Sequence, residues 1–118
     1  MTVIEDKIKI NRGNALSLDI SIDNSGNDYT FQDGDFVTFA IYNRKGLNQE
    51  PLVSKKVTCT PNTTTVNIAL TTEEMKIGEK INKEKVYWYE ITLNNEVVLG
   101  YDENGEKELI LYPEGADL

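Results

Sequence analysis

The acidic side chains are the residues with which this chain could most readily do chemistry, because the sequence holds 20 Asp and Glu, one cysteine and no histidine. Two close pairs, Glu73–Glu74 and Asp33–Asp35, offer the residue types of an acid and a base. Adjacent residues on a helix do not converge, however, and the carboxylates of a glycosidase must face each other across a cleft. The absence of histidine removes the commonest general base and the commonest zinc ligand. We therefore expect the chain not to be an enzyme.

Two acidic loops have the oxygen-rich composition of a calcium site, "DNSGND" at 23–28 and "DENGEKE" at 102–108. Neither keeps the EF-hand order, because glycine falls at the fourth position and no glutamate closes a twelve-residue loop. Solvated turn residues explain both loops, so we predict no metal and no cofactor. The lone Cys59 can form no intramolecular disulfide and fits a small apolar residue on a strand.

The aromatic segment "VYWYEITL" at 86–93 carries the best candidate for binding. Its alternation places an apolar row toward a core and Trp88 on the opposite face. An outward tryptophan is covered by neighbouring chain, packs into a protein partner, or stacks on a sugar ring, and all three readings stay open at this point. We take Trp88, Tyr42 and Tyr101 as the candidate partner-binding residues.

Period-2 alternation dominates the rest of the chain and predicts about seven or eight short strands separated by turns. Half-buried antiparallel strands need a second sheet to cover their apolar face, so the fold class predicted is all-β, an immunoglobulin-like antiparallel β-sandwich. The lysines of the strand at 52–59 are typical of a sheet edge. The predicted strands lie at 7–10, 15–22, 35–43, 52–59, 64–70, 86–93, 96–102 and 107–112.

Three further features complete the predicted architecture. Capping residues before Met75 and the glycine at 78 predict one short helix near residues 71–78. Asn104–Gly105 predicts a hairpin that joins the last two strands. The final strand should stop at Pro113, which lacks an N–H for the ladder. We expect residues 1–118 to form a single domain, with 113–118 as an exit tail toward a further segment.

Size and charge narrow the classes of function. A chain of 118 residues suits one domain, and its net charge of −8 disfavours binding to nucleic acid or to anionic membrane surfaces. No apolar run is long enough to cross a bilayer. The opening "MTVIEDKIKI" lacks the basic and apolar regions of a secretory signal, so we expect a protein made in the cytoplasm.

Three stretches together resemble the N-terminal domain of phage baseplate upper proteins and related prophage tail proteins. "RGNALSLDISI" is similar to the family's opening strand, although Asn14 stands where an Asp is expected and Ala15 where a Ser or Thr is expected. "DFVTFAIYN" resembles its next strand, and "LTTEEMKIGEKINKEKVYWYEITL" resembles its Thr-Glu, Gly and Tyr-x-Tyr pattern. With the closing "LYPEG", the similarity extends from Arg12 to Gly115.

The resemblance implies a non-enzymatic structural module that docks in a phage or prophage tail, at the baseplate, through protein–protein contacts. Its expected partners are other virion or tail proteins, or further copies of the same chain, and its expected location is the virion. No catalytic residue is implied. The alternative is a carbohydrate-binding or adhesive immunoglobulin-like module, for which Trp88, Tyr101 and Tyr42 would supply the stacking surfaces.

Overall fold

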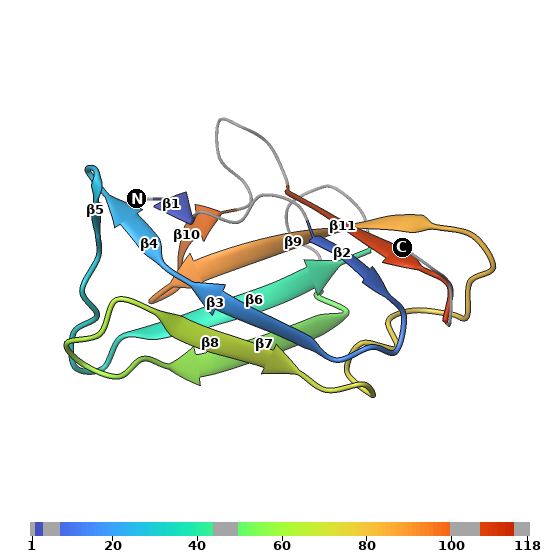
Figure 1. The fold of residues 1–118 in the computed structure, drawn as a ribbon, viewed down its shortest axis with the longest axis horizontal. Helices are drawn as coiled ribbons and strands as arrows, with labels where there is room; N and C mark the ends of the chain where they lie inside the picture. The colour runs from blue at the N-terminus through green and yellow to red at the C-terminus, as the bar shows by residue number, and fades with distance from the viewer. Residues whose placement is uncertain (1, 4–7, 44–49, 100–106, 115–118) are drawn as a thin grey trace.

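β-Strands account for nearly all the regular structure in the computed structural model, which describes residues 2–3, 8–43, 50–99 and 107–114 (Figure 1). The prediction of an all-β fold is confirmed for these residues. Their strands are β1 (Thr2–Val3), β2 (Ile8–Asn11), β3 (Leu16–Ile20), β4 (Ile22–Asn24), β5 (Asn27–Asp28), β6 (Phe36–Tyr42), β7 (Val53–Thr58), β8 (Val66–Leu70), β9 (Lys85–Leu93), β10 (Glu96–Leu99) and β11 (Lys107–Tyr112).

The largest sheet has six strands and is built around β9. β6 pairs with one edge of β9, while β11 and β10 follow each other along the opposite edge. The order β2-β11-β9-β6-β7 leaves β7 at an edge, as the lysines of that segment predicted. All pairs in this sheet are antiparallel except β2 with β11, which is parallel.

A core between the large sheet and the two-stranded sheet β3-β8 holds the fold together. Figure 1 shows β3 and β8 crossing in front of β6. The alternation read from the sequence is confirmed on β6, β8 and β9, whose inward side chains are buried while their neighbours are less so. Burying apolar area of this kind is the main force that stabilises such a domain. The largest fully buried side chains are Phe31, Phe39, Tyr87, Tyr89, Ile20, Ile22, Ile41, Ile68, Leu70, Met75, Ile91 and Leu109.

The segment predicted as one strand at 15–22 is divided between two sheets. Its first part, β3, pairs with β8, whereas Ile22 begins β4, which pairs with β1 and β5 in a small third sheet. Ile20 and Ile22 are both fully buried, so the apolar alternation continues across the change of sheet. Alternation reports burial and not the pairing partner. The predicted count of seven or eight strands is therefore lower than the eleven found in the described part of the chain.

The hairpin predicted at Asn104–Gly105 is wrong in its pairing. β10 turns back onto β9 through Asn94 and Asn95, which have φ of 50° and 70°. Two successive positive φ values fit the tight turn that joins twisted antiparallel strands, and asparagine tolerates them. β11 then pairs with β9 and β2, and not with β10. Asn104 and Gly105 themselves lie outside the described residues.

The helix predicted near residues 71–78 is also wrong, because the segment forms only a turn. The capping chemistry is present: the Thr71 N–H donates to the Glu74 carboxylate at 2.9 Å, and the Glu74 N–H donates to the Thr71 hydroxyl at 3.2 Å. Met75 and Ile77 are both buried, at a spacing of two that suits an extended chain better than a helix. The capping bonds therefore form, but the chain makes a single turn at 72–75 and does not continue as a helix.

Arg12, in the loop after β2, holds the residues that follow this turn by hydrogen bonds. Its guanidinium donates to the carbonyls of Lys76, Ile77 and Gly78 at 3.3, 3.1 and 3.0 Å. It also forms a salt bridge with Glu114, and its own N–H donates to the Tyr112 carbonyl at 2.8 Å. Because these carbonyls bond to Arg12, the turn and the end of β11 are tied to the loop after β2.

Replacing Gly78 with alanine is expected to destabilise the protein by about 2 kcal/mol, since Gly78 combines a positive φ of 63° with a close neighbour. A Cβ at this position would lie 2.7 Å from the hydroxyl oxygen of the fully buried Tyr87. That hydroxyl has no hydrogen-bond partner among the described residues, so Tyr87→Phe alone should cost less than about 1 kcal/mol. Urea unfolding of Gly78→Ala, of Tyr87→Phe and of the variant with both substitutions measures the interaction free energy between the two positions.

Tyr87→Phe is the matched rescue, because it removes the oxygen that the new methyl group would meet. The double variant should recover about half of the loss, and the backbone strain should account for the rest. Strictly additive effects of the two substitutions would contradict this explanation.

Candidate functional site

The carboxylates considered as an acid and a base are engaged in structural contacts. Asp35, which is 7% exposed, accepts hydrogen bonds from the Gln32 N–H at 2.8 Å, the Asn94 amide at 2.8 Å and the Tyr29 hydroxyl at 2.7 Å. These three donors hold the pKa of Asp35 below its ordinary value. A carboxylate so fully bonded is a poor proton acceptor. Its predicted companion Asp33 is exposed.

Glu73 and Glu74 do not form a pair either. Glu73 contacts Lys76 at 3.2 Å, while Glu74 lies 3.5 Å from Lys55 and caps the turn. The Thr71 N–H donates to Glu74 and is the main reason that the pKa of this carboxyl is lowered. The two carboxylates line one shallow hollow, but each is held by a different lysine, so they do not act as an acid and a base.

No group of three or more metal-ligating side chains occurs within the described ranges. The first acidic loop, 23–28, forms the tight connection of β4 to β5, with positive φ at Ser25 and Gly26. The second acidic loop lies largely outside the described residues. Cys59 is buried, and burial raises the pKa of its thiol, which disfavours the reactive thiolate.

Two of the three candidate partner-binding residues lie directly opposite each other on the outward face of the six-stranded sheet. The register pairs Tyr42 of β6 with Trp88 of β9, and both side chains are half-buried. Residues opposite each other in antiparallel strands have neighbouring side chains on one face. On the other side of Trp88, β11 presents Glu108. Tyr101 lies outside the described residues.

The indole N–H of Trp88 is buried and has no hydrogen-bond acceptor among the described residues. A buried tryptophan usually places its N–H against an acceptor, because an unpaired polar group out of water costs free energy. The turn at 72–75 bonds to the loop after β2, where the Gly13 N–H donates to the Met75 carbonyl at 3.1 Å. Coverage of Trp88 by neighbouring chain, one of the three alternatives considered from the sequence, therefore does not explain why its N–H lacks an acceptor.

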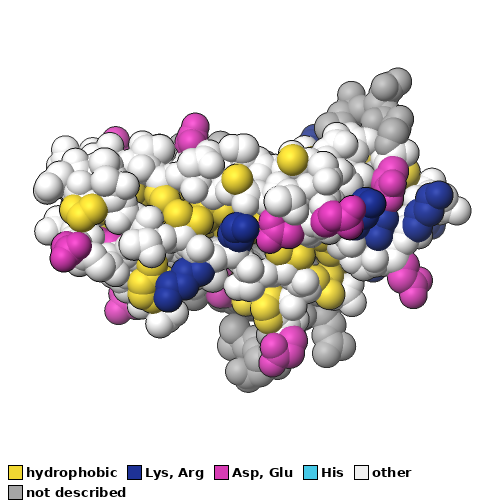
Figure 2. Space-filling view, turned by 90° about the horizontal axis from the view of Figure 1, so that it is seen from below, with side chains coloured by type: hydrophobic (Ala, Val, Ile, Leu, Met, Phe, Trp, Pro, Cys, Tyr) yellow, Lys and Arg dark blue, Asp and Glu magenta, His cyan; other side chains and the backbone are white. Residues whose placement is uncertain are grey.

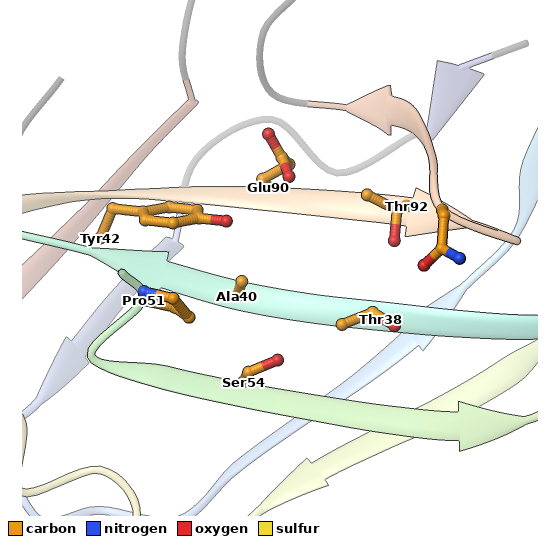
Figure 3. Close-up of a pocket in the computed structure, with 8 residues that line it drawn as sticks. Thr38, Ala40, Tyr42, Pro51, Ser54, Glu90 and Thr92 are labelled. Atoms are coloured by element: carbon orange, nitrogen blue, oxygen red, sulfur yellow. The ribbon is translucent and has the colours of Figure 1, made fainter. Parts of the chain in front are cut away.

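A hollow of about 260 Å³ is lined by Tyr42, one member of this aromatic pair (Figure 3). Ala40 lies at its base because it is the small residue between larger neighbours on β6, and the register places Glu90 and Ser54 on either side of it. Tyr42 lies along one end, and its hydroxyl hydrogen-bonds the Glu90 carboxylate. The remaining lining residues are Thr38, Pro51, Thr92 and Asn95.

Glu90 and Ala40 are the residues of this site that the sequence analysis did not single out. The signal was present, because both alternate with core residues and must therefore share the face of Tyr42 and Trp88. What could not be read was the register that places them next to each other across β6 and β9. Strands distant in sequence pair according to the whole fold.

Replacing Glu90 with glutamine is expected to stabilise the protein at pH 7 by about 2–4 °C in Tm. Burial raises the pKa of Glu90, and the Tyr42 hydroxyl offsets this only in part. The folded state therefore binds the proton more tightly than the unfolded chain does, and stability falls as pH rises from the unfolded pKa through the folded one. Thermal unfolding from pH 4 to pH 8 should show a weaker decline for Glu90→Gln. An unchanged pH profile would contradict the assignment.

A second hollow of about 410 Å³ lies at the edge of β7, near Leu52, which is 43% exposed. Figure 2 views the molecule from the side of β7 and β8 and shows apolar side chains interspersed with charges of both signs. The lining carboxylates Glu73 and Glu74 are already paired with lysines. This edge therefore lacks the unpaired charged group that distinguishes the hollow at Ala40.

Known proteins give no further guide to the site. A scan of the chain against protein-family models matches no family, and a search of curated proteins finds no match. No described segment forms a helix that is long and apolar enough to cross a membrane. The outward face of the six-stranded sheet, with Tyr42, Trp88 and the hollow at Ala40, is therefore the candidate functional surface.

Proposed function

We propose that this chain is a non-enzymatic docking module of a phage or prophage tail assembly, and that it binds other tail proteins through the outward face of its six-stranded sheet. The observation that carries the proposal is the Tyr42–Trp88 pair with its unpaired indole N–H. Trp and Tyr are enriched at the centres of protein interfaces, where an N–H finds its acceptor on the partner. The protein would then be located in the virion.

The resemblance to phage baseplate upper proteins and prophage tail proteins supports this reading from the sequence side. Two of the stretches that carry it meet in the fold, because Arg12 of the first bonds to the turn within the third. We further propose that the sandwich is immunoglobulin-like, which the large and small sheets around one core support.

A carbohydrate-binding module is the second candidate, and the hollow at Ala40 favours it. The ring of Tyr42 and the polar groups of Thr38, Thr92 and Asn95 provide an aromatic surface beside hydrogen-bonding groups. Sugars are recognised by this combination of stacking and hydroxyl contacts. Saturable binding to a glycan array that is lost in Tyr42→Ala would favour this function over docking.

Co-sedimentation with tail particles tests the docking proposal. The tagged chain should appear in particles purified from the organism that encodes it, and Trp88→Ser should lower its incorporation by at least about tenfold, the loss of one interface anchor. Glu79→Gln, an exposed substitution away from the outward face, is the matched control and should incorporate normally. Particles that lack the wild-type chain would overturn the proposal.

A further inference from the structure

The hollow at Ala40 contains a carboxylate that no cation in the described part of the chain neutralises. Glu90 is half-buried, and its described polar partner is the Tyr42 hydroxyl. Among the described salt bridges, Arg12, Lys55 and Lys76 each bind a carboxylate other than Glu90. Lys56, on the same face, lies over the ring of Phe36 at 4.2 Å. A charged group that is removed from water without a counter-ion costs stability in the free protein.

We propose that this hollow receives the guanidinium of an arginine side chain from a protein partner, with the Glu90 carboxylate as its counter-ion. The inference rests on the proposed docking function and adds the chemistry of the partner. The complex would then supply the charge that Glu90 lacks in the free chain.

The shape and polarity of the lining fit a guanidinium. Arginine carries five N–H donors and no acceptor, and the lining offers acceptors in the Glu90 carboxylate and in the hydroxyls of Thr38 and Thr92. The ring of Tyr42 adds an aromatic surface, on which the planar guanidinium can stack. A lysine ammonium is more strongly hydrated and lacks the planar fork, so it would fill the site less well.

The charge of the whole molecule points to the same class of partner. The net charge of −8 favours encounters with basic surfaces and disfavours anionic ones. Arginine is also among the residues most enriched at interface centres beside Trp and Tyr. The Tyr42–Trp88 pair and the Glu90 hollow, which adjoin across β6 and β9, thus form one surface for an arginine-containing segment.

NMR titration with three short peptides tests the inference. The probes are blocked Gly-Arg-Gly and its versions with lysine or with citrulline, which has the shape of arginine but no charge. The arginine peptide should shift the amide signals of Ala40, Thr38 and Thr92. The citrulline peptide should bind at least about tenfold more weakly, because the charge-assisted hydrogen bonds are lost.

Variants separate a binding role of Glu90 from a structural one. Glu90→Gln should lose the arginine response while keeping equal or higher thermal stability, and Glu84→Gln, an exposed acid elsewhere, should keep the response. Equal binding of arginine and citrulline, or a response that survives in Glu90→Gln, would overturn the inference. Shifts caused by a methyl glycoside and not by arginine would replace it with the carbohydrate reading.

The two proposals can fail separately. If the peptides do not bind but Trp88→Ser still prevents incorporation into tail particles, the arginine inference is wrong and the docking function stands. If arginine binds but the wild-type chain is missing from the particles, the hollow at Ala40 does bind arginine and the assignment to a tail assembly is wrong.

Discussion

Replacing Asp35 with alanine is expected to lower the free energy of unfolding by about 3 kcal/mol, because one carboxylate accepts three hydrogen bonds. Three donors would lose their acceptor at once: the Tyr29 hydroxyl, the Gln32 N–H and the Asn94 amide. Hydrogen bonds to a charged group contribute more than neutral ones, and the carboxylate that accepts all three is itself buried. The network also spans the fold, because Asn94 forms the β9–β10 turn and its side-chain oxygen accepts from the Phe36 N–H at 3.0 Å.

The pH dependence gives a second readout for Asp35. Its folded pKa is lowered, chiefly by the Gln32 N–H and then by Asn94 and Tyr29. The stability that the carboxylate contributes is therefore fully present above its unfolded pKa of about 3.9 and is lost as pH falls toward the lower folded value. Asp35→Asn should reduce this loss on acidification, whereas the exposed Asp33→Asn should not. Identical acid unfolding of the two variants would contradict the network's role.

Replacing Arg12 with alanine is expected to cost about 3 kcal/mol, because one guanidinium holds three backbone carbonyls. The bonds join the loop after β2 to residues 76–78. Arg12→Lys should recover only part of the loss, since an ammonium cannot reach three carbonyls in the geometry of a planar fork. Guanidinium chloride unfolding of both variants gives the two free energies.

Glu114→Gln is the control that separates the carbonyl contacts from the ion pair. The Glu114 side chain is 41% exposed, so its salt bridge with Arg12 should contribute less than about 1 kcal/mol. If Glu114→Gln costs as much as Arg12→Ala, the ion pair and not the bonds to residues 76–78 fixes this corner of the fold.

The positions of the strands could be predicted from the sequence because burial imposes a period of two on each of them. Val37, Phe39 and Ile41 alternate in the sequence and are all fully buried, and Leu109 and Leu111 are buried in the strand that ends before Pro113. The same reasoning placed Trp88 on the face opposite Tyr87 and Tyr89, which the burial pattern of β9 confirms.

Pairing and long-range contacts could not be predicted in this way. The helix expected near 71–78 has its capping box, but the carbonyls after Met75 bond to Arg12, which lies more than sixty positions earlier in the sequence. The strands expected to pair with each other across Asn104–Gly105 pair with others instead, β10 with β9, and β11 with β9 and β2. The choice of partner depends on contacts between segments that are distant in the sequence.

The candidate site shows the same division. Tyr42 and Trp88 were identified one by one as outward aromatic residues, whereas their pairing depends on the register of β6 with β9. Glu90 could not be identified as a site residue from the sequence, because an acidic residue on the outward face of a strand is common. Its importance comes from the alanine opposite it, which leaves the carboxylate beside a hollow without a cation from the described part of the chain.

Hydroxyl-radical footprinting of the chain in tail particles tests the central claim most directly, because tyrosine and the single tryptophan of this chain are oxidised readily when solvent reaches them. The docking account predicts that oxidation of Tyr42 and Trp88 falls in particles relative to the free chain, while oxidation of Tyr29, which bonds to Asp35 away from that face, stays the same. Equal oxidation of Tyr42 and Trp88 in the two states would show that this face is not the docking surface.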